Sequence, residues 1–178
     1  MNEKEKTMEN ESPRQKPAYT LCHPNAKGTG CAVRIELNPA HDYVDGSIVM
    51  TFMEQKTIGS IQYGRRIMPT FASDNRISVR LSLNEIAQIL EVLRGYREKV
   101  ADGNGFFHKT PDASTIITFE HRLEPVPGYV LSVSRKTLDG NTKRMWIHLS
   151  LPEALTLSEA ISGSMMYLAF GIPTNLIH

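Results

Sequence analysis

The sequence predicts an α+β fold in which a unit of four antiparallel strands and one helix occurs twice. Residues 76–95, RISVRLSLNEIAQILEVLRG, and residues 144–163, RMWIHLSLPEALTLSEAISG, share an arginine, Leu-Ser-Leu, two glutamates and a closing glycine at matching positions. In each copy, an alternating strand pattern changes at a serine to the spacing of a helix. An internal repeat indicates a duplicated structural unit, so we expect two ββββα repeats, over residues 25–100 and 104–172.

Both copies carry the signature of a capped corner between a strand and a helix. Ser82 and Ser150 stand three residues before Glu85 and Glu153, which is the spacing of a capping box. In that arrangement the serine oxygen accepts a hydrogen bond from the helix backbone, and the glutamate accepts one from the serine amide. The two corners therefore predict two helices that begin directly after these serines.

The two predicted helices differ in their apolar surface. The first has a single apolar stripe, and we expect it to end near Lys99. The second, over residues 151–170, is apolar on more than one face. A helix of this kind needs more cover than one sheet gives, so it packs against the other helix or forms a subunit interface.

The earlier strands of the first half follow from alternation of apolar and polar residues. Strands are predicted over residues 31–37 and 47–54, after a turn-rich entry over residues 19–30. A third, less regular strand is predicted over residues 57–72, where glycine and proline interrupt the pattern.

The second half repeats this order. The predicted strands lie within residues 105–110, 114–125 and 128–136. Residues 49–52, VMTF, match residues 116–119, IITF, and this match extends the repeat upstream of the helix.

Composition limits the classes of protein to consider. A net charge of +1 over 178 residues argues against a wrapper of duplex DNA, although it permits a local basic face. Two cysteines exclude a disulfide framework, and no apolar run has membrane-spanning length. Residues 1–18 are charged and almost without apolar side chains, which predicts a disordered tail. We expect a cytoplasmic protein with no membrane partner, whose folded part is a single domain over residues 19–178.

Several segments resemble the Whirly family of single-stranded-DNA-binding proteins. Residues 27–33, KGTGCAV, are similar to the family's Lys-Gly-Lys-Ala-Ala-Leu segment, with Gly30 at the place of its internal lysine. Residues 105–108, GFFH, 81–90, LSLNEIAQIL, and 123–136, LEPVPGYVLSVSRK, resemble further family segments in the same order. Positive cofactor 4 and the trypanosome guide-RNA-binding proteins are similar in architecture.

The resemblance implies a fold and a function. The fold is two ββββα units whose antiparallel sheets pack through their helices, assembled as a homotetramer that binds single-stranded DNA. The missing lysine leaves higher-order assembly and part of the DNA contact open. The absence of a transit peptide indicates a bacterial or phage relative rather than a plant organelle protein.

Binding a single strand requires cations for its backbone and exposed aromatic faces for its bases. Strand parity and the resemblance select the candidate contacts Lys27, Arg34, Tyr63, Arg65, Arg66, Arg76, Arg80, Phe106, Tyr129, Lys136, Lys143, Arg144, Trp146 and His148. Phe107 is the alternative to Phe106, and Trp146 in a subunit interface is the alternative to stacking. For the arginines, the alternative is that they form ordinary surface ion pairs. For the glycines beside Lys27, the alternative is that they only shape a turn.

Other chemistries lack a pattern in the sequence. Cys22, His23 and Cys31 do not have the spacing of a zinc site, and no second Cys/His pair completes one. No P-loop, nucleophile elbow or HExxH motif is present. We therefore expect no enzyme, no cofactor and no metal.

The function that we expect is non-sequence-specific binding of single-stranded DNA by a homo-oligomer, which protects or organises single strands in replication, recombination or repair. An RNA-binding or annealing protein of the same fold is one alternative. A structural or interaction module without nucleic-acid binding is the other.

Overall fold

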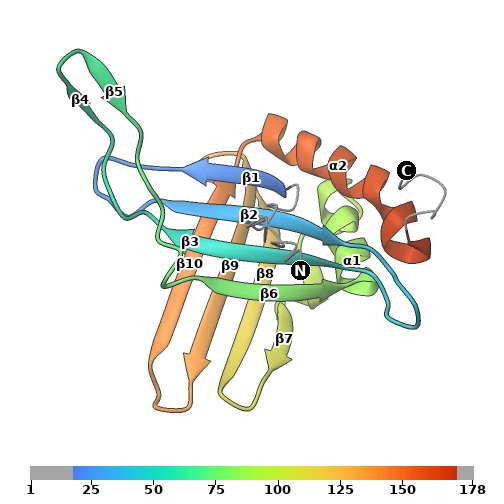
Figure 1. Cartoon of the computed structure of the whole chain (residues 1–178). Helices are drawn as coiled ribbons and strands as arrows, with labels where there is room; N and C mark the ends of the chain where they lie inside the picture. The colour runs from blue at the N-terminus through green and yellow to red at the C-terminus, as the bar shows by residue number, and fades with distance from the viewer. Residues whose placement is uncertain (1–17, 172–178) are drawn as a thin grey trace, which may run out of the picture.

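In the computed structural model, which describes residues 18–171, each half of the chain forms one four-stranded antiparallel sheet followed by one helix (Figure 1). The first sheet has the order β1 (Ala18–His23), β2 (Cys31–Asn38), β3 (Ser47–Glu54) and β6 (Ile77–Ser82), and leads into α1 (Leu83–Leu93). The second has the order β7 (Phe106–Lys109), β8 (Ala113–Arg122), β9 (Gly128–Thr137) and β10 (Thr142–Leu149), and leads into α2 (Leu151–Phe170). The predicted α+β fold of two ββββα repeats is confirmed.

Two short elements interrupt this repeat. Strands β4 (Ser60–Gln62) and β5 (Arg65–Ile67) form a separate two-stranded hairpin, and the 3₁₀ helix η1 (Val100–Gly103) joins the two halves. In Figure 1 the hairpin projects away from both sheets, at the end of the molecule opposite the helices.

The first half departs from the prediction in three places. The predicted turn-rich entry over residues 19–30 begins with β1, the edge strand that pairs with β2, and Ala18 already belongs to it; the rest of the predicted tail lies outside the described residues. The predicted third strand over residues 57–72 is the β4–β5 hairpin instead. Helix α1 ends at Leu93 rather than near Lys99, because Gly95 turns the chain with a φ of 75°.

The match between residues 49–52 and 116–119 was also wrong as a guide to the repeat. Residues 49–52 lie in β3, the third strand of its sheet, whereas residues 116–119 lie in β8, the second strand of its sheet. Both stretches are alternating strands with a buried phenylalanine, Phe52 and Phe119, and this shared pattern explains their similarity.

The apolar faces of both sheets meet the helices in one core. In Figure 1 the strands of the two sheets cross steeply, and both helices lie at the same end of the molecule. Helix α1 packs against α2 and β8, while α2 also contacts β2, β9 and β10. The largest buried side chains come from both sheets and both helices: Ile48, Met50, Phe52, Leu81, Ile86, Ile89, Ile117, Phe119, Leu131, Ile147, Leu149 and Leu157.

The two predicted capping boxes are both present. The amide of Ser82 donates to Oε2 of Glu85 at 2.8 Å, and the amide of Ser150 donates to Oε2 of Glu153 at 2.9 Å. Each glutamate thereby satisfies an amide that the helix itself leaves unpaired.

Each capping glutamate also holds a histidine from the first strand of the opposite repeat. Oε1 of Glu85 lies 2.6 Å from Nε2 of His108 on β7, and Oε1 of Glu153 lies 2.7 Å from Nε2 of His23 on β1. The two contacts are equivalent under exchange of the repeats. They join the start of each helix to the edge strand of the other sheet.

These contacts make the stability of the folded protein depend on pH. Burial alone would raise the pKa of Glu85, but hydrogen bonds from His108 and Ser82 outweigh it and hold the pKa below its ordinary value of 4.5. Burial would likewise raise the pKa of Glu153, and bonds from Ser150 and His23 lower it. Carboxylates with a lowered pKa contribute stability that is fully present above about pH 4.5 and is lost as the pH falls through the folded-state pKa.

We predict that the double variant Glu85→Gln/Glu153→Gln is less stable than the parent at pH 7 and that this difference shrinks toward pH 3. Glutamine preserves the neutral hydrogen bonds and removes the charge, so each substitution is expected to cost about 1 kcal/mol. Urea unfolding between pH 3 and 7 measures the difference, with Glu159→Gln, an exposed position of α2, as control. Parallel stability curves for parent and double variant would contradict the prediction.

Candidate nucleic-acid interface

The outer face of the second sheet, meaning the side of β7–β10 that faces away from the helices, carries polar, cationic and aromatic side chains in register. One row across the sheet is formed by Phe107, Ile116, Ser134 and Arg144. The next row places Trp146 beside a pair of hydroxyl residues, Ser132 and Thr118. A third row, nearer the β9–β10 turn, contains Lys109, Ser114, Lys136 and Thr142.

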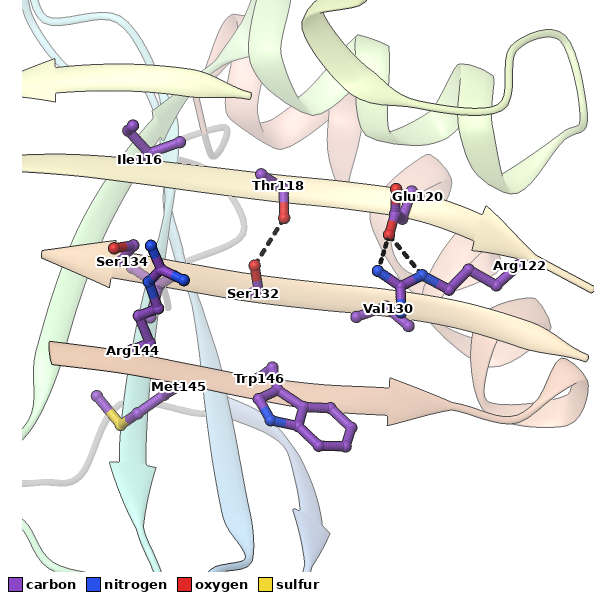
Figure 2. A pocket seen from close by; sticks show the side chains of 11 residues that line it. Ile116, Thr118, Glu120, Arg122, Val130, Ser132, Ser134, Arg144, Met145 and Trp146 are labelled. Carbon is purple, nitrogen blue, oxygen red and sulfur yellow. Dashed lines mark hydrogen bonds and ion pairs between the residues drawn. The ribbon is translucent and has the colours of Figure 1, made fainter. Parts of the chain in front are cut away.

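Two aromatic rings stand open to solvent at opposite edges of this face. Trp146 on β10 and Phe107 on β7 are each 62% exposed. Between them, Oγ1 of Thr118 and Oγ of Ser132 form a hydrogen bond of 2.7 Å. These two short side chains leave a polar depression in the middle of the face. Figure 2 shows the resulting groove over β8, β9 and β10, with Arg144 lying across β9 toward Ser134.

The charge on this face is positive. Among the described residues that line the groove, Glu120 is the one carboxylate, and it is ion-paired with Arg122 and with Lys99, whose Nζ lies 3.3 Å from Oε2. Burial would raise the pKa of Glu120, but hydrogen bonds from Arg122 and Lys99 outweigh it and lower the pKa. The carboxylate is therefore ionised and neutralised at neutral pH, while Arg144 forms no hydrogen bond or ion pair within residues 18–171 and remains available to an anion.

A glycine-rich loop from the first repeat borders the same face. Residues 28–31 line a groove of about 360 Å³ together with Glu54 and Gln55 of the first repeat and Arg144 and Trp146 of the second. Segments more than 100 residues apart in the sequence therefore meet at the outer edge of β10.

The backbone amides of this loop are already occupied. Asn25 accepts the amides of residues 27, 28 and 29, two through its side-chain oxygen at 3.0 and 3.1 Å and one through its carbonyl at 3.2 Å. The amide of Gly30 donates to Oε1 of Gln55 at 3.1 Å. The glycines therefore shape a turn, and of this loop it is the exposed ammonium of Lys27 that is left for a phosphate.

Gly30 has a steric reason to be glycine. A Cβ at this position would overlap the side-chain oxygen of Gln55 and the carbonyl of His23. The position that holds a lysine in the resembling family segment therefore has no space for any side chain in this chain.

Apart from Lys27 in the glycine-rich loop, the sequence-predicted residues are distributed over four places. The outer face of the second sheet holds Lys136, Arg144, Trp146 and His148. The outer face of the first sheet holds Arg34, Arg80 and, just before β6, Arg76. The β4–β5 hairpin holds Tyr63, Arg65 and Arg66. The inner side of the second sheet holds Phe106, Tyr129 and Lys143.

The three residues on the inner side are corrections to the predicted surface. Phe106 is 5% exposed and belongs to the core. Tyr129 stacks on Phe119 with ring centroids 5.6 Å apart, and its hydroxyl donates to the carbonyl of Leu93. Nζ of Lys143 lies 2.8 Å from Oε2 of Glu54. Each faces the protein because the phase of its strand alternation places it opposite the outer residues.

Three further predicted residues have structural partners on the outer faces. NH2 of Arg34 lies 3.1 Å from Oε1 of Glu36 in an ion pair. Nε of Arg80 donates to Oγ of Ser47 at 2.8 Å, and its NH2 group donates to the carbonyl of Asp45 at 3.0 Å, so Arg80 holds the β2–β3 loop. Nε2 of His148 lies 3.3 Å from the carbonyl of Val126.

Sequence reasoning missed two members of the outer face, Ile116 and Lys109, and it preferred Phe106 to Phe107, which was its alternative. The alternation that buries Phe106 turns Phe107 and Lys109 outward. Nothing local to the sequence indicated that Asn25 and Gln55 would organise the loop.

The cysteines do not form a metal site. His23 is held by Glu153, Cys22 is exposed, and burial raises the pKa of the Cys31 thiol to about 11. Within residues 18–171, no group of three His, Cys, Asp or Glu side chains is arranged to hold a metal ion. In the same range, no helix is long and apolar enough to cross a membrane.

Comparison with known proteins identifies the fold. No protein-family model matches the chain, and neither does any curated protein. Among solved structures, WHY1 from Arabidopsis thaliana superposes with a TM-score of 0.68 at 15% identity, covering 89% of this chain and 88% of that one. WHY3 from Arabidopsis thaliana gives 0.64 at 18% identity, covering 88% and 90%. The plant transcriptional regulator PBF-2 gives 0.63 at 16% identity, covering 88% and 84%.

These three structures are Whirly proteins, so the chain has the Whirly fold that its motifs indicated.

We predict that Gln55→Ala destabilises the protein and loosens the glycine-rich loop. Gln55 is buried and makes four hydrogen bonds, to the amides of Asn25 and Gly30 and to the carbonyls of Asn25 and Thr57. Leaving these groups unpaired is expected to cost roughly 1–3 kcal/mol. Urea unfolding measures the loss, and hydrogen exchange of the Gly30 amide reports the loop directly. Gln62→Ala, at an exposed hairpin position, is the control, and equal stability of the two variants would contradict the prediction.

Proposed function

We propose that this protein binds single-stranded DNA without sequence preference, on the outer face of its second sheet. The observation that carries the proposal is the pair of open aromatic rings, Trp146 and Phe107, on one sheet face with Arg144, which has no partner within residues 18–171, in the row of Phe107 and next to Trp146 on β10. Bases stack on such rings with little dependence on sequence, while cations beside them meet the phosphates.

The same features favour a single strand over a duplex. In a duplex the base faces are stacked on each other, so exposed rings on a sheet gain little from it. The net charge of +1 gives no general attraction for a phosphate helix. A protein built this way gains affinity where bases are free.

The Whirly fold supports the proposal in combination with the motifs. Four segments of the chain resemble those of Whirly single-stranded-DNA-binding proteins, and the fold places one of them, residues 27–33, beside Arg144 and Trp146. We infer a binding protein, not an enzyme, whose work is to protect or organise single strands in replication, recombination or repair.

RNA is the alternative ligand, because stacking and phosphate contacts do not depend on the sugar. A matched pair of DNA and RNA oligomers of the same sequence separates the two. A protein that binds neither would be an interaction module on the same fold.

We further propose that the chain assembles as a homotetramer through α2. This helix exposes apolar residues one turn apart near each of its ends, Leu151 and Leu155 at the start and Met166 and Phe170 at the end, with the exposed Glu159 between the two pairs. An apolar stripe on a helix is typical of a face covered by a partner. Assembly would leave the outer face of the second sheet open, because that face lies on the side of the sheet opposite the helices.

We predict that oligo-dT quenches the fluorescence of this protein. Trp146 is the single tryptophan of the chain, so its emission reports the proposed site without a label. The affinity should exceed that for duplex DNA of equal length and fall steeply as salt rises. Trp146→Ala removes this reporter, so it is titrated with a fluorescently labelled oligo-dT; it should weaken binding about tenfold or more, because a stacked base is worth roughly 1–3 kcal/mol.

Controls for this titration follow from the charge distribution. Arg144→Ala removes the cation next to Trp146 on the outer face and should weaken binding, as followed by Trp146 quenching. Arg94→Gln removes a cation on the helix side, where its side chain donates to Ser162, and should leave affinity unchanged. Equal losses in both variants, or binding indifferent to salt, would exclude the outer face as the site.

We predict that Leu155→Glu/Met166→Glu reduces the assembly to smaller species without unfolding the protomer. Both side chains are exposed in the protomer, so their loss costs little protomer stability, while two buried charges are incompatible with an apolar interface. Light scattering coupled to size-exclusion chromatography measures the mass, and circular dichroism checks the fold. A parent protein that is already monomeric would contradict the proposed assembly.

A further inference from the structure

The β4–β5 hairpin is a built arm that packs on neither sheet. We define the arm as residues 55–71. Its base is closed by a bridge between Gln55 and Phe71 and by a hydrogen bond of 2.7 Å from the amide of Lys56 to the carbonyl of Thr70. Its tip is a two-residue turn in which Tyr63 and Gly64 have φ values of 50° and 73°, as type I′ hairpin turns require. The arm is therefore a defined β-ribbon that extends into solvent (Figure 1).

The surface of the arm has the chemistry of a nucleic-acid contact. Residues 55–73 contain three cations, Lys56, Arg65 and Arg66, and no aspartate or glutamate. None of the three side chains forms a hydrogen bond or ion pair with another residue of the described chain. At the tip, the side chain of Tyr63 is fully exposed, with Ile61 before it in the sequence and Arg65 and Arg66 after it. In a chain whose net charge is +1, this is a local concentration of positive charge around an open ring.

The arm lies beside the groove that contains Trp146. One wall of a second groove, of about 730 Å³, is formed by residues 24–26, which lead into the glycine-rich loop, and the other by residues 58–61, 66, 67 and 69 of the arm. Gln55 lines both this groove and the one that contains Arg144 and Trp146. The two grooves therefore lie on either side of Gln55, which places the arm next to the groove at Arg144 and Trp146.

We propose that the arm is a second contact for the same single strand, where Arg65, Arg66 and Lys56 hold the phosphates of the segment that leaves the sheet and Tyr63 stacks on a base. This inference rests on the proposed function and extends its site beyond the outer face. A polyanion is the partner that fits, since the arm offers three unpaired cations and no acid with which a second copy of the arm could form complementary contacts. The arm thereby gives the protein a longer site than its sheet alone provides.

The test compares short and long oligo-dT, of about 6 and about 30 nucleotides, on the parent and on the triple variant Lys56→Gln/Arg65→Gln/Arg66→Gln. The short oligomer fills the outer face alone, so both proteins should bind it equally and with the same quenching of Trp146. The long oligomer should bind the variant at least tenfold more weakly. Its logarithmic salt dependence should fall by about two, since each lost phosphate contact on a single strand contributes roughly 0.7.

Two further variants separate charge from folding. Arg65→Lys/Arg66→Lys keeps the charge and should retain the affinity for the long oligomer. A variant in which residues 60–67 are replaced by an Asn-Gly turn removes the arm and should behave like the triple variant, with unchanged unfolding of the protein.

The outcomes distinguish the arm from the outer face. Equal binding of the long oligomer by parent and triple variant would overturn the arm's role while leaving the proposed function intact. A fall in assembly mass on removal of the arm, with DNA affinity per protomer unchanged, would also overturn it and assign the arm to a second copy of the chain. Failure of the parent to bind either oligomer would instead remove the proposed function itself.

Discussion

The contact between each capping glutamate and a histidine of the opposite repeat is the constraint on which the rest of the structure depends. Glu85 lies where β6 becomes α1, so its bond to His108 fixes three things at one point: the end of a strand, the start of a helix and the edge of the other sheet. Glu153 and His23 do the same in the reverse direction. Each repeat caps its own helix, but the histidine that binds the capping glutamate comes from the other repeat, and we infer that the two halves fold as one unit. Because both helices are thereby held on the inner side, both outer faces are left open.

The proposed binding face and the core are two sides of the same strands. On β10, Met145 and Ile147 are buried, whereas Trp146 is exposed and Arg144 lies in the groove of the outer face. A shift of one residue in the pairing of this strand would exchange the two sets. The register that the core imposes therefore also sets the spacing of cation and ring on the outside.

The capped corners were predictable because their information is local. A serine and a glutamate three residues apart specify a helix start with no knowledge of the rest of the chain, and both helices begin at the predicted residue. Strand β1 was missed because its polar neighbours conceal the alternation of Tyr19 and Leu21, and it exists only by pairing with β2. Phe106 was preferred to Phe107 as the exposed ring because a strand of four residues gives too little alternation to show which residues face outward. The arm was predicted to be a strand of the sheet because its composition is that of a strand. Only the pairing of β4 with β5 shows that it is a separate hairpin.

The glycine-rich loop differs from the resembling segment at the position of its internal lysine. Gly30 stands there, enclosed by Gln55 and the carbonyl of His23, and the loop amides are bound by Asn25 and Gln55. A loop that is saturated in this way offers an anion no backbone nest, and the Lys27 ammonium is its one cation. Further positive charge for a phosphate chain would have to come from residues that border the loop, which are Arg144 on one side and the arm's Arg66 on the other. The hydrogen bonds that occupy the loop amides also hold the loop in place between these two cations.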